Sequence, residues 1–281
     1  MTESPIIEAT TLALNDSQMR HILGAAMSEL VTTEHDGAVL IIRLNRPEAR
    51  NAINFDCAQA LAGAFEQLDS DDTIRIGVLT GEGGHFSAGM DLKDFAASGR
   101  RPRVPGRGFA GFTEQPPVKP LIAAVEGYAL AGGFEMVLAC DLVVAANTAM
   151  FGLPEVKRGL IAGAGGLLRL PQRLPYHVAM EAILTGEHMT AARIHAFGLI
   201  NTLTEPGQAL AEARVLAQKI AANGPLAVQL SKQVVNQGLD WSQEEMFAKQ
   251  VPFMEKIVAS LDAKEGALAF AQKRAPVWRG Q

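Results

Sequence analysis

The stretch from residue 120 to residue 146, PLIAAVEGYALAGGFEMVLACDLVVAA, places a glycine-led segment between two apolar runs. The apolar runs, 120–125 and 141–146, are short, as is typical of buried strands. The segment between them carries Phe134, Val137 and Leu138 at helical spacing. Strands that alternate with helices predict an α/β domain. Glu135 lies inside this apolar stretch, although a glutamate is rarely buried unless its carboxylate has a partner or a function.

The alternation continues toward the N-terminus. Residues 30–47 alternate apolar and polar side chains around His35-Asp36-Gly37, which predicts a β-hairpin with a type I′-like Asp-Gly turn. Residues 52–72 have helical spacing, and residues 74–81 predict a buried strand that ends at a glycine. The N-terminal part of the chain therefore has the same strand-and-helix character.

From residue 206 onward the pattern is only helical. Two of the last helices are predicted to begin at capping boxes, Ser242 with Glu245 and Asp262 with Glu265. We therefore expect an N-terminal extension over 1–28, an α/β core over 29–205, and a helical C-terminal region over 206–281.

The composition excludes several classes of function. The chain has 281 residues, 48% of them hydrophobic, and a formal net charge of −5, so nothing indicates attraction to nucleic acid or to an anionic membrane. Cys57 and Cys140 lack a CxxC spacing and are expected to be buried thiols in a reducing compartment. The acidic N-terminus lacks signal-peptide features, and acids interrupt the longest apolar region. We expect a cytoplasmic protein.

Three stretches concentrate glycine: 81–89, 127–133 and 159–166. None of them has the spacing of a P-loop or of a dinucleotide fingerprint. Glycine does allow close backbone approach, and a helix that starts near Gly132 leaves its first N–H groups unpaired. One such donor can stabilise an oxyanion by about 2.7–4 kcal/mol. The alternative is that these glycines only form tight turns in a crowded core.

A second acid in an apolar context, Glu155, follows Glu135 twenty residues further along the chain. Two acids around one small site raise each other's pKa, and desolvation raises both further. One protonated acid and one ionised base could then coexist near neutral pH. The alternatives are that Glu155 pairs on the surface with Lys157 or Arg158, and that backbone amides satisfy Glu135.

The histidines indicate no metal site. His177, His188 and His195 do not fall at a metal-binding spacing, and His85 beside a glycine turn is explained by the turn. We therefore expect no metal.

Five stretches of the chain together form a distinctive set: IIRLNRPEARNAIN (41–54), FSAGMDLKDF (86–95), residues 119–146, FGLPEVKRGLIAGAGGLLRLP (151–171) and GALAFAQKRAPVW (266–278). With them the chain resembles the enoyl-CoA hydratase/isomerase (crotonase) superfamily, from about Val31 to Gly280. This resemblance implies a spiral of ββα units with a helical C-terminal region, assembled as a homotrimer or as a homohexamer of two trimers.

The resemblance also implies roles for individual residues. The backbone N–H groups of Met90 and Gly132 match the oxyanion hole, Glu135 matches the residue that activates water, and Glu155 matches the one that exchanges the proton at Cα. The substrate is then an acyl-CoA thioester, with no cofactor besides the coenzyme A that it carries. The positions that match CoA or substrate contacts are Arg46, Ala49, Arg50, Asn51, Ala52, Ala88, Asp91, Leu92, Lys93, Phe270 and Lys273, the last two often from a neighbouring subunit.

The resemblance favours reversible hydration of trans-2-enoyl-CoA to 3-hydroxyacyl-CoA. Dehydration of a carnitinyl-like acyl-CoA keeps the same site with another substrate, whereas an isomerase usually needs only one acid. A non-catalytic acyl-CoA binder would not need two acids.

The chain departs from the family pattern in three places. Leu153 replaces a polar residue common in hydratases, and Met90 is bulkier than the usual alanine, although only its backbone is needed. The segment 98–117 carries four arginines where family members have a variable loop bordering the acyl pocket; we expect a mobile, solvated loop, and the alternative is that the arginines contact a phosphate.

Overall fold

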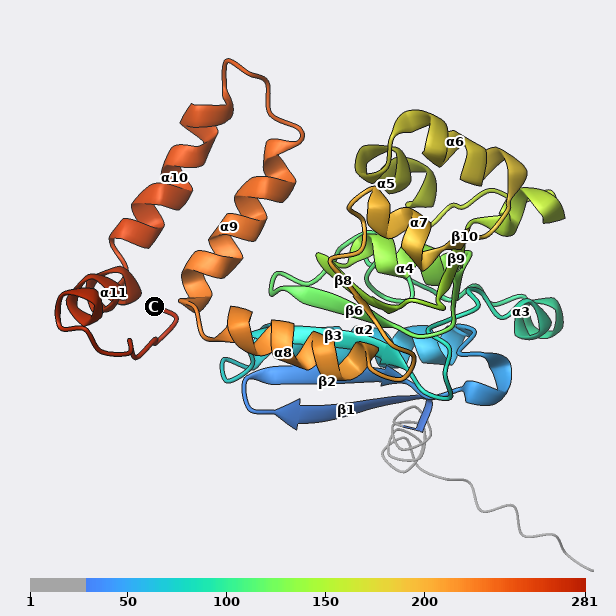
Figure 1. The fold of residues 1–281 in the computed structure, drawn as a ribbon, viewed down its shortest axis with the longest axis horizontal. Helices are drawn as coiled ribbons and strands as arrows, with labels where there is room; N and C mark the ends of the chain where they lie inside the picture. The colour runs from blue at the N-terminus through green and yellow to red at the C-terminus, as the bar shows by residue number, and fades with distance from the viewer. Residues whose placement is uncertain (1–28) are drawn as a thin grey trace, which may run out of the picture.

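The computed structural model describes residues 29–281 (Figure 1), so the predicted extension over 1–28 lies outside the described residues. Within this range the main sheet has the strand order β1-β2-β3-β6-β8-β11. The pair β1 and β2 is antiparallel, and every other neighbouring pair is parallel. The strands are β1 (Val31–Asp36), β2 (Val39–Leu44), β3 (Ile76–Gly81), β6 (Leu121–Val125), β8 (Leu142–Ala146) and β11 (Thr202–Thr204).

A smaller sheet has the order β10-β9-β7. Strand β6 is followed by β7 and helix α4, and β8 is followed by β9 and the 3₁₀ helix η2, so each unit gives one strand to each sheet. Because β6 neighbours β8 and β7 neighbours β9, the units stack side by side, which agrees with the expected spiral of ββα units. The bounds are β7 (Tyr128–Leu130), α4 (Gly132–Ala139), β9 (Met150–Gly152), η2 (Pro154–Arg158) and β10 (Met189–Thr190).

The remaining helices cover the sheets and extend to one side. Helix α8 lies along the main sheet, where Ala209, Ala213 and Ala217 are buried, whereas α9, α10 and α11 project away from the body (Figure 1). The predicted division near residue 206 stays a prediction. The bounds are η1 (Pro47–Ala49), α2 (Phe55–Ser70), α3 (Leu92–Ser98), α5 (Gly166–Arg173), α6 (Tyr176–Thr185), α7 (Ala191–Ala196), α8 (Ala209–Ala221), α9 (Pro225–Gly238), α10 (Met246–Val258) and α11 (Leu261–Ala271). A short hairpin joins β4 (Arg103–Val104) to β5 (Gly108–Phe109).

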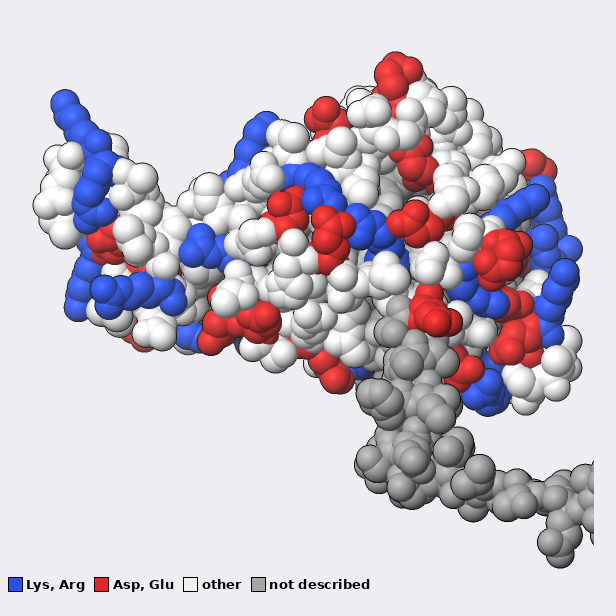
Figure 2. All heavy atoms as spheres, turned by 90° about the horizontal axis from the view of Figure 1, so that it is seen from below, with Lys and Arg blue, Asp and Glu red and all other residues white. Residues whose placement is uncertain are grey.

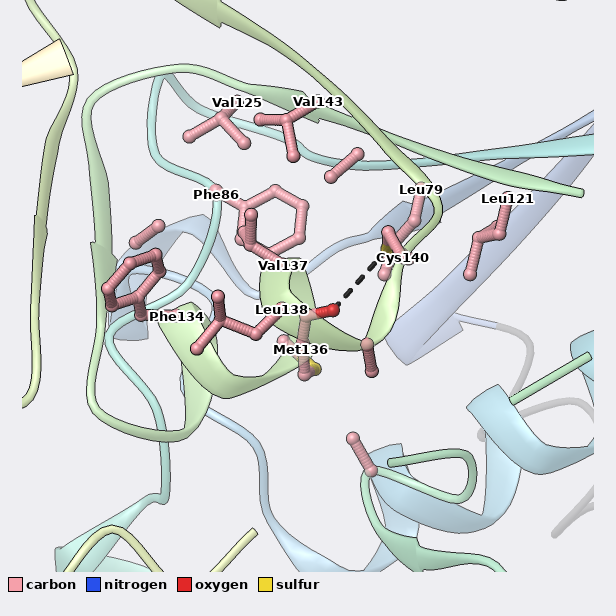
Figure 3. Packing of buried hydrophobic residues seen from close by; sticks show 14 of the residues in the cluster. Leu79, Phe86, Leu121, Val125, Phe134, Met136, Val137, Leu138, Cys140 and Val143 are labelled. Atoms are coloured by element: carbon pink, nitrogen blue, oxygen red, sulfur yellow. Dashed lines mark hydrogen bonds between the residues drawn. The ribbon is translucent and has the colours of Figure 1, made fainter. Parts of the chain in front are cut away.

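Helix α4 lies in the middle of the core, and all of its residues are buried. Figure 3 shows Phe134, Val137 and Leu138 packed among side chains such as Phe86 and Val125. Since no face of α4 meets solvent, Glu135 on its first turn is carried into the interior. The core therefore explains why this carboxylate is buried.

Both thiols are buried, as predicted. Desolvation raises the pKa of Cys57 to about 12 and that of Cys140 further. The Cys140 thiol donates to the carbonyl of Met136 at 3.3 Å inside the same core (Figure 3). Neither thiol therefore ionises near neutral pH.

Three local predictions were wrong in detail. Helix α10 begins at Met246 with Glu245 as its N-cap residue and no side-chain cap, so Ser242 and Glu245 do not form the predicted capping box. The hairpin forms, but Asp36 pairs with Val39, so its two-residue loop is Gly37-Ala38 rather than Asp36-Gly37. Gly37 takes the loop position with a positive φ, +59°, which glycine adopts more readily than a residue with a Cβ. Helix α11 is capped by Ser260 instead of Asp262, because the Asp262 carboxylate accepts the N–H groups of Arg279 and Gly280 and so anchors the C-terminal tail.

Basic and acidic side chains are interspersed over the face drawn in Figure 2, and no continuous basic surface is visible there. Within residues 29–281 no helix has the length and apolar character needed to cross a bilayer.

Candidate active site

Two segments far apart in the chain lie side by side at the start of α4. The N–H of Ser87 donates to the carbonyl of Tyr128 at 2.9 Å, and the N–H of Leu130 donates to the carbonyl of Ser87 at 3.0 Å. Gly89 has φ +90°, and a Cβ at this position would lie 2.9 Å from the backbone nitrogen of Gly132. Only glycine allows the two backbones to come this close.

The backbone N–H of Gly132 is the first of α4, so no carbonyl one turn earlier accepts it. The preceding residue, Ala131, has φ +51° and ψ −128°, a strained conformation for a residue with a Cβ. Its N–H donates to the carbonyl of Gly152 at 2.9 Å, and its own carbonyl accepts the N–H of Glu135 at 3.0 Å. These bonds fix the orientation of the Ala131–Gly132 peptide.

The N–H of Met90 lies in the neighbouring segment. A short parallel bridge joins Ile53 to this segment: Ile53 donates to the carbonyl of Gly89 at 2.8 Å, and Asp91 donates to the carbonyl of Ile53 at 2.9 Å. Neither of these two hydrogen bonds uses the N–H of Met90. The structure therefore brings together the two residues that the sequence predicted as oxyanion donors.

The Glu135 side chain is 3% exposed and is held by the loop that precedes α5. Its Oε1 accepts the N–H groups of Ala164 at 2.7 Å and Gly166 at 2.8 Å. Burial raises the pKa of Glu135, while these two hydrogen bonds and the charge of Arg169 oppose the rise. The predicted alternative, a carboxylate satisfied by backbone amides, is thus correct for Oε1, and among residues 29–281 no hydrogen bond is formed to Oε2.

Glu155 lies on η2, half-buried, and its Oε2 is fully buried without a hydrogen-bond partner among the described residues. The pKa of Glu155 is raised to about 7. Burial is the largest cause and the negative charge of Glu135 adds to it, while a backbone hydrogen bond and the charge of Arg158 act in the opposite direction. A carboxyl group with this pKa is substantially protonated near neutral pH. The two acids are therefore close enough to influence each other.

Glu155 does not form the alternative surface ion pair with Lys157 or Arg158. Lys157 pairs with Glu187 at 2.6 Å, and Arg158 donates to the carbonyl of Pro154 at 3.3 Å. Leu153, two residues before Glu155 in the chain, is buried.

The residues predicted to contact CoA fall on two adjacent segments, 46–52 and 88–93. The N–H of Ala88 donates to the carbonyl of Arg50 at 3.0 Å. The side chains of Arg50, Leu92 and Lys93 are exposed and open to a ligand, and Ala49 is half-buried. Asn51 and Ala52 are buried and can offer a ligand little beyond backbone.

Arg46 and Asp91 bind each other. Their side chains are separated by 2.9 Å and are mostly buried, and Arg46 also donates to the carbonyl of Ala52. Asp91 caps α3 by accepting the N–H groups of Lys93 and Asp94. Desolvation acts to raise the pKa of Asp91, but these bonds and Arg46 outweigh it, so the pKa is lowered. This pair holds the two predicted CoA segments together.

Phe270 and Lys273 are the predicted residues that the structure does not bring to the site within one chain. They lie at the end of α11, which Figure 1 places at the opposite side of the molecule from α3. The Phe270 side chain is 88% exposed. Their contact with CoA from a neighbouring subunit stays a prediction.

Three features of the site were missed by the sequence analysis. The N–H groups of Ala164 and Gly166 hold Glu135, and the glycine run 159–166 was their only signal. Arg169 of α5 donates to the carbonyl of Thr113 at 2.6 Å, and the ring of Phe109 contacts Gly132. No spacing in the sequence signals these last two contacts.

The stability of the protein should depend on the protonation of Glu155. Because the pKa rises from 4.5 to about 7 on folding, the folded state binds the extra proton, and stability falls as pH rises through this interval. Glu155→Gln removes this loss: the variant should match wild type at pH 5 and be more stable at pH 8.5 by roughly 1–2 kcal/mol, after allowance for partial exposure. Urea unfolding at both pH values measures the difference, and an equal difference at both would contradict the assignment.

Comparison with known proteins agrees with this geometry. Residues 34–281 match the family model of enoyl-CoA hydratase/isomerase. Carnitinyl-CoA dehydratase of Salmonella arizonae is 41% identical over 90% of this chain and 100% of its own length. Enoyl-CoA hydratase EchA19 of Mycobacterium tuberculosis is 41% identical over 86% of this chain and 94% of its own length. A crystal structure of enoyl-CoA hydratase from M. tuberculosis H37Rv superposes with a TM-score of 0.88. It is 55% identical in sequence, and the match covers 90% of this chain and 100% of the chain in that structure. The chain belongs to the enoyl-CoA hydratase/isomerase family.

Proposed function

We propose that this protein catalyses the reversible addition of water to a trans-2-enoyl-CoA to give a 3-hydroxyacyl-CoA. One observation carries the proposal: α4 begins at Gly132, whose N–H has no hydrogen-bond partner among residues 29–281, and carries a buried carboxylate, Glu135, three residues later. A second acid, Glu155, with a pKa of about 7, senses the charge of the first. Donors for an oxyanion and two acids for proton transfer are the groups that hydration of a thioester requires.

The N–H groups of Met90 and Gly132 donate hydrogen bonds to the thioester carbonyl oxygen, which lies between them. When water adds at Cβ, negative charge develops on this oxygen as an enolate, and both donors strengthen their bonds to it. The strained but well-anchored peptide at Ala131 supports this role, because its donor need not reorient during the reaction.

The two acids divide the proton transfers. Glu135 as carboxylate orients a water molecule and takes one of its protons while the water oxygen bonds to Cβ. Glu155 in its protonated form gives its proton to Cα, so one proton and one hydroxyl are added in total. Transfer of the proton from Glu135 to Glu155 by way of solvent restores the starting state. The reaction is redox-neutral and needs no cofactor beyond the coenzyme A of the substrate.

Coenzyme A is proposed to bind along the segments 46–52 and 88–93. The exposed side chains of Arg50 and Lys93 supply positive charge for its phosphates, and Leu92 supplies apolar surface. The Arg46–Asp91 pair keeps these segments in register.

A second candidate is dehydration of carnitinyl-CoA. It is favoured by the relative of that name, which this chain matches at 41% identity over its full length. The same two acids serve both reactions, run in opposite directions. Isomerisation alone would need only one of the two buried acids, and acyl-CoA binding without turnover would need neither.

We further propose that α9, α10 and α11 form subunit contacts of a homotrimer or homohexamer. Helices α10 and α11 carry large apolar side chains in the open, including Phe247 at 76% and Phe270 at 88% exposed. Large exposed apolar side chains gathered on two neighbouring helices are typical of an interaction site. Light scattering of the purified protein should give three or six times the chain mass of 29.9 kDa, and a monomer would contradict this assembly.

The reaction is tested by the loss of the conjugated-thioester absorbance when crotonyl-CoA is mixed with enzyme. Wild type should consume the absorbance, and Glu135→Gln and Glu155→Gln should each lower kcat by about 10²–10⁴-fold because each removes an acid–base group. CoA affinity should change little, since neither acid lies on the proposed CoA segments.

Substrate and control arms decide between the candidates. Glu187→Gln, which alters an exposed acid paired with Lys157, should retain wild-type kcat. Carnitinyl-CoA offered in parallel should be turned over faster than crotonyl-CoA if the second candidate is correct. CoA binding without turnover of either substrate, or variants as active as wild type, would refute the proposed reaction.

A further inference from the structure

We propose that the hairpin formed by residues 100–114 is a fixed wall on the acyl side of the site, and that Phe109 limits the length of acyl group that fits. The proposal rests on the proposed acyl-CoA function and deepens it by naming the substrate class, short-chain acyl thioesters. It follows from where the Phe109 ring lies and from what prevents the hairpin from moving.

The Phe109 ring lies directly against the start of α4. A Cβ built on Gly132 would lie 2.5 Å from Cζ and 2.7 Å from Cε1 of this ring, so the ring occupies the space over the Gly132 Cα. The side chain is only half-buried. A thioester oxygen bound to the Gly132 N–H at about 2.9 Å would bring the attached acyl carbons beside the ring.

The segment after Phe109 is locked onto α2. Gly111 has φ +74°, and a Cβ there would lie 2.7 Å from the carbonyl oxygen of Ala58, so the backbones are in direct contact. Phe112 is fully buried and its ring centroid lies 4.4 Å from that of Phe65. The hairpin cannot swing outward without removing a phenylalanine from the core, which costs about 3–5 kcal/mol for a complete loss of such a side chain.

Two arginines of this segment, Arg100 and Arg107, pair with acids of α2, and Arg103 pairs with Glu114 within the hairpin itself. The side chains of Arg100 and Arg103 remain largely exposed, as expected of a solvated segment. Each exposed pair contributes little alone, but three of them bind along one short segment. The pairs are Arg100–Asp56 at 3.2 Å, Arg103–Glu114 at 2.7 Å and Arg107–Glu66 at 3.2 Å.

The far end of the hairpin is tied to the loop that holds Glu135. Arg169 donates to the carbonyl of Thr113 at 2.6 Å and lies 3.5 Å from the carbonyl of Ala164, whose own N–H binds Glu135. The hairpin therefore contacts the oxyanion side of the site through Phe109 and the acid side through Arg169. A wall fixed at both sides selects ligands by size instead of adapting to them.

Binding of saturated acyl-CoAs tests this size limit without any chemical step. Each methylene that finds apolar space should raise affinity about fourfold. For wild type, calorimetry should give octanoyl-CoA no tighter binding than butyryl-CoA. Phe109→Ala should raise the ratio of octanoyl to butyryl affinity by at least about tenfold, and Phe109→Leu should give an intermediate ratio.

The matched control is Phe197→Ala, a change of the same kind at the end of α7, where the side chain is 38% exposed. It should leave the ratio at the wild-type value, and thermal unfolding checks that each variant folds. Phe109→Leu keeps the test valid if Phe109→Ala does not fold. Wild type that binds octanoyl-CoA far more tightly, with a ratio unchanged in both Phe109 variants, would overturn the inference.

The two proposals fail separately. Hydration of crotonyl-CoA with an unchanged affinity ratio would leave the reaction standing and refute the role of Phe109. A changed ratio without hydration of any enoyl-CoA would support Phe109 as the length limit and refute the proposed reaction.

Discussion

The site depends on the close approach of two backbones at Gly89 and Gly132. Any side chain at Gly89 would collide with the nitrogen of Gly132, so the two segments can meet only where residue 89 lacks a Cβ. The hydrogen bonds between Ser87 and its neighbours on β7 set the register of this contact. From it follows the direction of α4, which leaves the sheet edge and enters the core with its N-terminus at the surface of the site.

The burial of α4 determines the electrostatics. A helix with no solvent-facing side carries Glu135 out of water, and the cost of a buried charge is reduced by two backbone N–H groups on one oxygen. Glu155 has less such help: its Oε2 has no partner among the residues described, and the charge of Glu135 lies nearby. The two acids therefore differ in role: Glu135 is held as a hydrogen-bond acceptor, and Glu155 can carry a proton near neutral pH.

Much of this arrangement could be predicted from the sequence because it depends on local signals. Apolar runs and helical spacing predicted β6, α4 and β8, and the glycines around Gly132 predicted exposed N–H groups. The capping of α11 by Ser260 was missed because two nearby polar residues could each begin that helix. The contact of Phe109 with Gly132 could not be predicted, since it arises only when the hairpin docks on α2.

The central claim is that the N–H groups of Met90 and Gly132 polarise a bound thioester carbonyl. Vibrational difference spectroscopy tests it directly, with crotonyl-CoA labelled with ¹³C at the carbonyl and bound to the Glu135→Gln, Glu155→Gln double variant, which should hold the substrate without turnover. The account predicts that the carbonyl stretch moves to lower wavenumber on binding, because two donors draw electron density toward the oxygen. An unchanged frequency at demonstrated saturation of the site would contradict it.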